Sequence, residues 1–177
     1  MTKKKAALST REIALFAMLG TVLFLSKLIM ELAPNIHILG MLIMVYTLVY
    51  RKKALIPLYV YVILLGIYCS FASWWIPYLY IWTVLWAVTM LLPKGIPRKI
   101  AVPVYMAVCT LHGLCFGILY APAQALLFGL SFKGMLTWIA AGFPFDVIHA
   151  LGNLAGSILI VPMAELLCKL DRGIQKA

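Results

Sequence analysis

The chain has 177 residues, of which 65% are hydrophobic and only 11% are charged, and its mean hydropathy is +1.05. A soluble domain of this size carries about 25% charged residues and could not bury so much apolar surface. The four cysteines, Cys69, Cys109, Cys115 and Cys168, have the spacing of neither a disulfide framework nor a metal site. The net charge of +10 does not indicate a nucleic-acid partner, because the basic residues form short clusters between apolar runs. The composition therefore predicts an all-α polytopic membrane protein.

Six apolar runs are candidates for membrane-spanning helices, because about 20 mostly apolar residues cross a bilayer. In chain order they are 13–32, 36–50, 54–71, 76–92, 100–120 and a last run that ends near residue 168. Pro, Gly or clustered basic residues separate these runs and interrupt the helical backbone. The first run is too long for a signal peptide and has no Ala-x-Ala cleavage site, so we expect it to stay as a span. We expect one membrane domain, with a basic N-terminal segment 1–11, a six-helix bundle 12–168 and a tail 169–177.

The basic residues predict an orientation for these six spans. Thirteen of the fifteen Lys and Arg residues lie in segments that six spans would place on one side: Lys3, Lys4, Lys5, Arg11, Arg51, Lys52, Lys53, Lys94, Arg98, Lys99, Lys169, Arg172 and Lys176. The loops of the opposite side hold only Lys133. Because short basic loops stay in the cytoplasm, we expect both termini there.

The start of the last span has two interpretations. Pro144 suits the first position of a helix, where its missing N–H costs nothing. The preferred prediction therefore begins the sixth helix at Pro144 and makes 123–142 a folded element near the outer surface. In the alternative, the helix begins at Gly134 and Pro144 produces a kink. Asp146 lies in the outermost turn in the first case and near mid-membrane in the second.

Asp146, His149 and Asn153 have i, i+3, i+7 spacing and therefore share one face of the last helix. An ionisable group inside a membrane costs about 2.5–3.5 kcal/mol on insertion scales, so each needs a partner or a purpose. The three side chains either form the wall of a ligand pocket or form a polar seam that joins helices. His112, near the middle of the fifth run, has the same two interpretations. A third possibility is an intramembrane enzyme, in which His112, Asp146 and His149 converge as acid–base groups around one water-filled cleft.

Lys27 and Glu31 lie four residues apart near the outer end of the first run. This spacing predicts an intrahelical ion pair that neutralises both charges. With Asp146, the two residues could instead form the ion path of a stand-alone secondary carrier or channel.

Aromatic residues concentrate near the predicted outer ends of the spans: Trp74, Trp75, Tyr78, Tyr80, Trp82 and Tyr120. Such residues form the interfacial belt of a membrane protein or stack on a flat ligand inside an apolar pocket. The sequence alone does not separate these roles, and we take Trp75 and Tyr120 as candidate ligand contacts.

The stretch Gly142-Phe143-Pro144-Phe145-Asp146-x-x-His149-x-x-x-Asn153 resembles the substrate-binding S components of energy-coupling factor (ECF) vitamin transporters. In that family the sixth helix often opens with Pro-Phe-(Asp/Asn)-x-x-(Lys/His). The six spans, the length and the basic cytoplasmic loops extend the resemblance over nearly the whole chain. It implies a subunit in a prokaryotic plasma membrane that captures a vitamin or vitamin precursor and is not an enzyme. The implied partners are a transmembrane coupling subunit and two cytoplasmic ATPases, with no cofactor or metal in this chain.

The resemblance also assigns roles to individual residues. The family's polar pocket positions correspond to Asp146 and His149, with Asn153 one turn deeper. Its capping loop corresponds to residues 33–37, so Asn35 and His37 become expected ligand contacts alongside those named above.

The family's docking surface is a patch of small residues on the first helix, often Ala-x-x-x-Ala. Here the corresponding residues are Ala14, Ala17 and Thr21, with Ala17-x-x-x-Thr21 as the nearest match. Small residues permit close approach between helices, so ordinary helix packing explains the patch equally well.

A carboxylate beside an imidazole suits a ring that carries amino or hydroxyl donors, such as a pyrimidine, a pyridine or a flavin-like ring.

Overall fold

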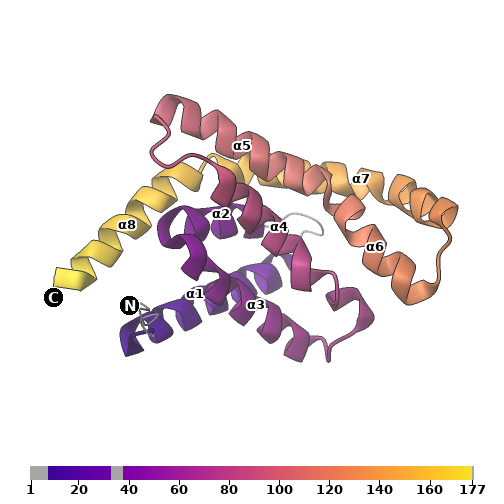
Figure 1. Ribbon diagram of the computed structural model, residues 1–177, viewed down its shortest axis with the longest axis horizontal. Coiled ribbons are helices and arrows are strands. Elements are labelled where there is room, and N and C mark those ends of the chain that lie inside the picture. The colour runs from indigo at the N-terminus through magenta and orange to yellow at the C-terminus, as the bar shows by residue number, and fades with distance from the viewer. Residues whose placement is uncertain (1–7, 33–37, 177) are drawn as a thin grey trace, which may run out of the picture.

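The computed structural model describes residues 8–32 and 38–176, and every regular element in these ranges is helical. The prediction of an all-α fold is confirmed. In chain order the elements are α1 (Thr10–Ile29), η1 (Met30–Leu32), α2 (Leu39–Tyr50), η2 (Arg51–Ala54), α3 (Leu55–Tyr68), η3 (Ser73–Trp75), α4 (Tyr78–Leu91), α5 (Arg98–Leu114), α6 (Phe116–Phe128), α7 (Phe132–Ser157) and α8 (Ile160–Lys176). Figure 1 shows α5 and α7 side by side along one edge of the bundle, and α8 extends beyond them towards the start of α1.

Helix α2 lies at the centre of the bundle and is buried over most of its length, from Leu39 to Thr47. It contacts α4 and α8, while α1 packs against α3 and α5 packs against α7. Large side chains such as Phe16, Tyr61 and Trp82 fill the core between these helices.

The outer surface of the bundle is apolar. Large hydrophobic side chains stand exposed on most helices, including Met18 (58%), Ile67 (61%), Leu126 (87%) and Leu151 (61%). Soluble proteins rarely expose contiguous apolar surface on this scale, so the arrangement is compatible with a lipid environment.

Within residues 8–32 and 38–176, four segments are long and apolar enough to cross a membrane: Thr10–Ile29, Ser73–Leu91, Arg98–Phe128 and Phe132–Ser157. They correspond to the first, fourth and fifth expected runs and to the beginning of the last one. The second and third runs form α2 and α3, which have only 12 and 14 residues. At about 1.5 Å per residue, such helices are shorter than a bilayer core of about 30 Å.

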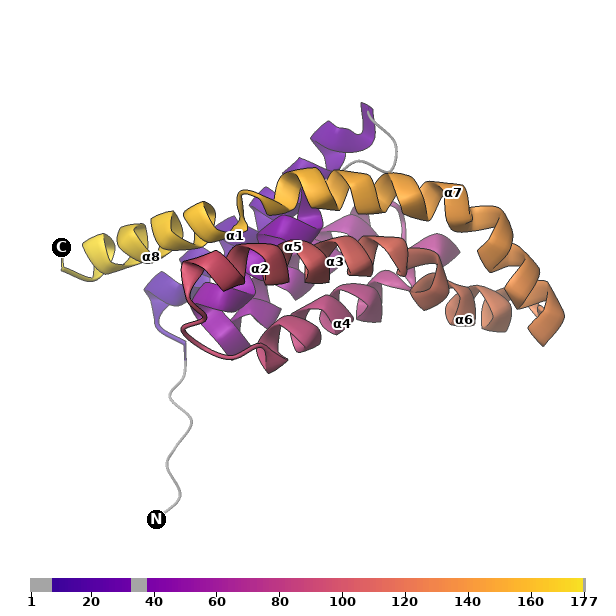
Figure 2. The same ribbon diagram turned by 90° about the horizontal axis from the view of Figure 1, so that it is seen from above.

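The preferred prediction for the last span is wrong, because Pro144 lies inside α7 and not at its first position. The helix begins at Phe132, where the Ser131 side chain accepts a hydrogen bond of 3.1 Å from the Gly134 N–H. This cap satisfies a backbone donor that would otherwise be unpaired, so the helix starts twelve residues earlier than Pro144. The alternative, with Pro144 within the helix, is closer to the structure, and Figure 2 shows that α7 bends in its N-terminal half.

Two further expectations about this region are corrected. The stretch 123–142 is not a separate element, because it consists of the end of α6, a short turn and the N-terminal half of α7. The last helix does not continue to residue 168, because α7 ends at Ser157 and α8 starts at Ile160. Asp146 therefore lies near the middle of α7, well beyond its first turn.

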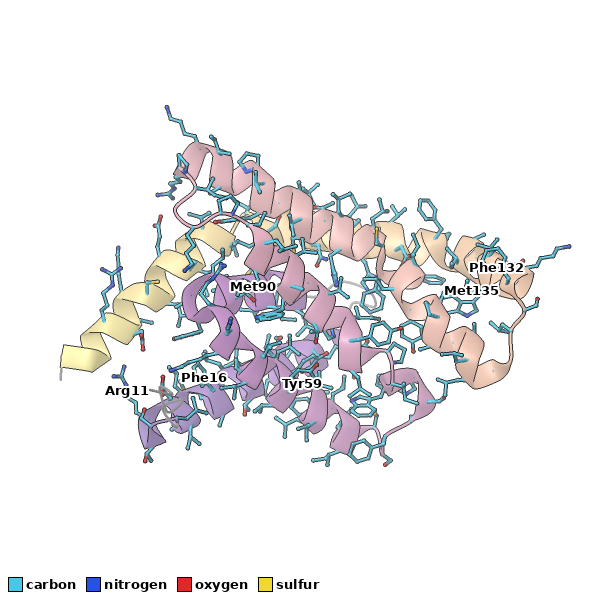
Figure 3. The ribbon with its side chains drawn as sticks, viewed as in Figure 1. Arg11, Phe16, Tyr59, Met90, Phe132 and Met135 are labelled. Carbon is cyan, nitrogen blue, oxygen red and sulfur yellow. The ribbon has the colours of Figure 1, made fainter. Side chains whose placement is uncertain are left out.

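One end of the molecule gathers basic segments that are distant in sequence. We call it the basic end and define it by four contacts. Arg11 pairs with Asp171 at 3.1 Å, Lys53 pairs with Glu12, Arg98 lies 3.7 Å from Glu165, and the Arg51 guanidinium donates to the Met90 carbonyl at 2.8 Å. In Figure 3, Arg11 lies near this end, whereas Phe132 and Met135 lie at the opposite end.

Candidate ligand-binding site

A cavity of about 320 Å³ lies between α6, α7 and the η3 turn. We call it the α6–α7 cavity. Half of its lining residues are aromatic: Trp74, Phe116, Tyr120, Phe128, Trp138 and Phe145. Its polar groups are few: Ser73, Gln124, Asp146 and His149. A volume of this size, with apolar walls and a few polar side chains, is typical of a small-molecule site.

Asp146 is 3% exposed and connects α7 to the start of α6. Its Oδ1 accepts a hydrogen bond of 2.9 Å from the Gly117 backbone N–H. Gly117 lies in the first turn of α6, where backbone N–H groups have no partner inside the helix and favour a nearby negative charge. The Asp146 Oδ2 accepts no hydrogen bond from the residues that the structure describes. The carboxylate therefore caps a helix with one oxygen and retains acceptor capacity at the other.

Gly117 is required for this contact. A Cβ added there would lie 3.1 Å from the Asp146 Cγ and 3.2 Å from its Oδ1, and closer still to Oδ2. Only a residue without a side chain lets the α6 backbone approach the carboxylate so closely.

His149 lies one turn after Asp146 and also lines the cavity. Its ring packs against Phe116 with a centroid separation of 4.8 Å and an interplanar angle of 32°. On the α5 side, a Cβ added at Gly113 would lie 3.0 Å from the His149 carbonyl carbon and oxygen. The close approach of α5 therefore fixes the backbone of α7 at the position that presents this imidazole.

Tyr120 and Trp138 form the most nearly parallel aromatic pair of the cavity. Their ring centroids are 5.6 Å apart and the rings are inclined by 14°. The Tyr120 hydroxyl donates to the Trp74 carbonyl at 2.6 Å, which ties α6 to the η3 turn. Tyr120 was expected at the site, whereas Trp74 was noted only as one of the aromatic residues near the outer ends and Trp138 was not singled out.

A helical face contains the signal that would have identified Trp138. Trp138, Gly142, Phe145, Asp146 and His149 all line the cavity, and their spacing follows one face of an α-helix. The preferred start of the last helix at Pro144 concealed this pattern, because it separated Trp138 from Asp146.

Asn153 shares the face of Asp146 but lies outside the cavity lining. It is 2% exposed, and its Nδ2 donates to the Cys109 carbonyl at 2.9 Å. A Cβ at Gly40 would lie 3.1 Å from the Asn153 Oδ1, and one at Gly113 would lie 2.7 Å from its Nδ2. Asn153 is thus enclosed where α2, α5 and α7 meet, as in the polar-seam interpretation.

His112 lines a different cavity, of about 230 Å³, between α4 and α5. Its Nε2 lies 3.1 Å from the Ile81 carbonyl oxygen, and its ring is 5.5 Å from that of Trp82. The Phe116 ring, 6.4 Å from His112, also contacts His149. The three acid–base groups of the enzyme alternative therefore do not line one common cleft.

Three expected contacts remain: Trp75, Asn35 and His37. The Trp75 Nε1 donates to the Val62 carbonyl at 2.8 Å, and the ring packs edge-on against Phe71, so the η3 turn directs Trp74 and not Trp75 into the cavity. Asn35 and His37 lie outside the described residues.

The Lys27–Glu31 ion pair is confirmed, with Nζ 3.1 Å from Oε1. This pairing neutralises two charges of the proposed ion path within one stretch of the chain. Among residues 8–32 and 38–176, no three His, Cys, Asp or Glu side chains are arranged to hold a metal ion.

Ala14, Ala17 and Thr21 lie together on an exposed face of α1. The Thr21 hydroxyl donates to the Ala17 carbonyl at 2.9 Å, so it is satisfied within the helix. These small residues do not mediate packing within the described part of the bundle, where α1 instead uses Gly20 against α3.

The chain matches no protein-family model, no curated protein and no solved structure. The functional conclusion therefore rests on the residues of this chain and their arrangement.

Proposed function

We propose that the chain is a membrane-embedded substrate-capture subunit that binds a vitamin or vitamin precursor in the α6–α7 cavity. The observation that carries this proposal is the joint presence of Asp146 and His149 on the wall of one aromatic cavity. A carboxylate and an imidazole one turn apart supply a hydrogen-bond acceptor and a group that can donate or accept. The aromatic rings around them supply stacking surface for a planar molecule.

The ligand that suits this wall is a small planar heterocycle with amino or hydroxyl donors. The Tyr120–Trp138 pair and the Phe116–His149 pair each present an aromatic face. We assign Asp146 Oδ2 to a ring donor of the ligand, because Oδ1 is already bonded to Gly117, whereas Oδ2 is buried without a hydrogen-bond partner among the described residues. In this proposal Asn153 holds α7 against α5 and α2, and the ligand contacts come from Asp146, His149 and the aromatic wall.

The proposed topology has six passes with both termini in the cytoplasm, formed by α1, α2, α3, α4, α5–α6 and α7–α8. The contacts of the basic end support it, because they join the start of α1, the α2–α3 junction, the α4–α5 junction and α8. An even number of passes is needed to bring all these segments to one side.

Uptake against a gradient requires an energy source, and we propose that an ATP-driven ECF module provides it. Its transmembrane coupling subunit would dock on the exposed α1 face that carries Ala14, Ala17 and Thr21. The accessibility of this face and its small side chains support the assignment, because they permit close approach of a partner helix.

The test is ligand retention by the purified chain. We expect native mass spectrometry and extraction of the wild-type protein to show one small heterocyclic compound bound. Asp146→Asn keeps an acceptor for the Gly117 N–H but removes the charge, and His149→Ala removes the imidazole. Each should lower affinity at least tenfold, because loss of a hydrogen bond to a charged group costs about 1.5–3 kcal/mol.

Phe143→Ala is the matched control, because Phe143 lies on the same helix and is 51% exposed outside the cavity. Its ligand occupancy should equal that of the wild type. Wild-type affinity in both Asp146→Asn and His149→Ala, with unchanged thermal stability, would remove the basis of the proposal.

A further inference from the structure

A second, larger cavity of about 440 Å³ lies at the basic end, between the α4–α5 connection, α5, α8 and the end of α2. We call it the basic cavity. Three cationic side chains line it, Arg51, Lys94 and Arg98, against a single carboxylate, Glu165. The lining therefore carries an excess of positive charge, which favours an anionic ligand.

The cationic side is held in place by backbone contacts. The Arg51 guanidinium donates to the Met90 carbonyl at the end of α4, and the Trp86 Nε1 donates to the Arg51 carbonyl at 3.1 Å. Arg98 lies at 3.7 Å from Glu165, but both side chains are largely exposed, at 67% and 49%. Exposed pairs contribute only about 0–1 kcal/mol, so this pair leaves Arg98 able to bind an anion.

The other side of the cavity is apolar and is formed by Leu48, Ile96, Tyr105, Val161 and Ala164. Two strongly exposed apolar side chains lie within a few residues of these cations in the sequence: Leu91 is 84% exposed and Ile100 is 54% exposed. The cavity thus lies where the apolar surface of the bundle meets its basic end. A ligand that fits both sides has an anionic group joined to a hydrocarbon chain.

We propose that the basic cavity binds an anionic phospholipid, with the headgroup phosphate against Arg51, Lys94 and Arg98 and an acyl chain along the apolar side. Basic pockets between helices at the cytoplasmic boundary of a membrane recognise lipid phosphates in this way. The inference rests on residence of the chain in a membrane and is independent of the substrate in the α6–α7 cavity.

The experiment uses the full chain in neutral detergent, titrated with phosphatidylglycerol and phosphatidylcholine of equal acyl length and followed by native mass spectrometry. We expect preferential binding of phosphatidylglycerol, reduced about tenfold or more in Lys94→Gln/Arg98→Gln, because each cation near a lipid phosphate contributes about 1 kcal/mol. The control Lys52→Gln/Lys99→Gln removes the same charge from residues that neighbour Arg51 and Arg98 but do not line the cavity. It should bind like the wild type.

Glu165→Gln tests the site by a gain of lipid affinity, because misfolding would lower the affinity and not raise it. Removing the only carboxylate of the lining should raise phosphatidylglycerol affinity several-fold. Equal binding of the two lipids, an undiminished affinity in Lys94→Gln/Arg98→Gln, or an equal loss in the control would overturn the proposal. Glycerophosphoglycerol and inorganic phosphate distinguish the ligand source: if either binds as tightly as the lipid, the site is for a soluble anion and the proposal is wrong.

Discussion

At the scale of single residues, a backbone group and not a basic side chain stabilises the buried carboxylate of Asp146. The Gly117 N–H at the start of α6 donates to it, and the positive end of that helix favours its charge. This arrangement leaves the second oxygen buried without a hydrogen-bond partner among the described residues. A salt bridge would have occupied both oxygens more completely.

Gly117→Ala tests this arrangement. The added methyl group overlaps the Asp146 carboxylate, so the side chain or the α6 backbone must move. We expect the free energy of unfolding in detergent to fall by about 1–3 kcal/mol, as for other overpacked sites. Ligand retention should fall as well, because the carboxylate leaves its position on the cavity wall.

Gly142 lines the cavity, so Gly142→Ala is a control for stability alone: beyond its chain neighbours and its own helical turn, no atom lies within 4 Å of a Cβ built there. In a helix this change should raise the unfolding free energy by up to about 1 kcal/mol. If both alanine variants have the same stability as the wild type, Asp146 and Gly117 do not pack as described.

At the scale of elements, α7 determines the site. Ser131 caps the helix at its start, and Pro144 is accommodated inside it with a bend in the N-terminal half. Proline inside a helix removes one backbone hydrogen bond, which membrane helices tolerate when neighbouring groups compensate. The bend places Trp138 against Tyr120, and the straight remainder places Asn153 against α5.

Pro144→Ala should therefore separate stability from binding. Restoring the backbone N–H favours a straight helix, so we expect the thermal unfolding temperature to stay the same or rise. Ligand affinity should fall several-fold, because Trp138 moves away from Tyr120. Thermal unfolding and native mass spectrometry of the same preparation measure both quantities.

Pro103→Ala controls for the removal of a helix-interior proline, since Pro103 lies in α5 and does not line the cavity. Its affinity should match the wild type. Unchanged affinity in Pro144→Ala would show that the bend does not position the aromatic wall.

At the scale of the whole molecule, charge and aromatic surface occupy opposite ends. Ion pairs and basic side chains gather at the basic end, and the α6–α7 cavity lies towards the turn between α6 and α7. Helix α2, of 12 residues, is buried from Leu39 to Thr47, whereas α3, of 14 residues, is buried along one face only and exposes Ile63, Ile67 and Tyr68.

Cysteine accessibility in intact cells tests the proposed orientation. In a background without the four native cysteines, Lys133→Cys should react with a membrane-impermeant maleimide added outside. Lys52→Cys and Lys99→Cys should react only after the cells are permeabilised, because the proposed topology places these basic segments in the cytoplasm. Equal labelling of all three positions without permeabilisation would contradict the topology.

Local periodicity let the sequence alone predict the helical class, the Lys27–Glu31 pair and the shared face of Asp146, His149 and Asn153. These features depend on residues a few positions apart and on the regular geometry of a helix. The preference for Pro144 as a helix start used the same local reasoning and failed, because the cap at Ser131 lies beyond a stretch that looked interrupted.

Only the tertiary structure decided which of the residues on one helix face line the cavity and which pack against other helices. Asp146 contacts Gly117, 29 residues earlier, and Asn153 contacts Cys109, 44 residues earlier. Those partners are selected by the close approach of helices at glycines, which no pattern within α7 encodes. The same packing sends His112 to a separate cavity and brings Trp138 to the ligand wall, because the position of a side chain in a bundle depends on neighbours far along the chain.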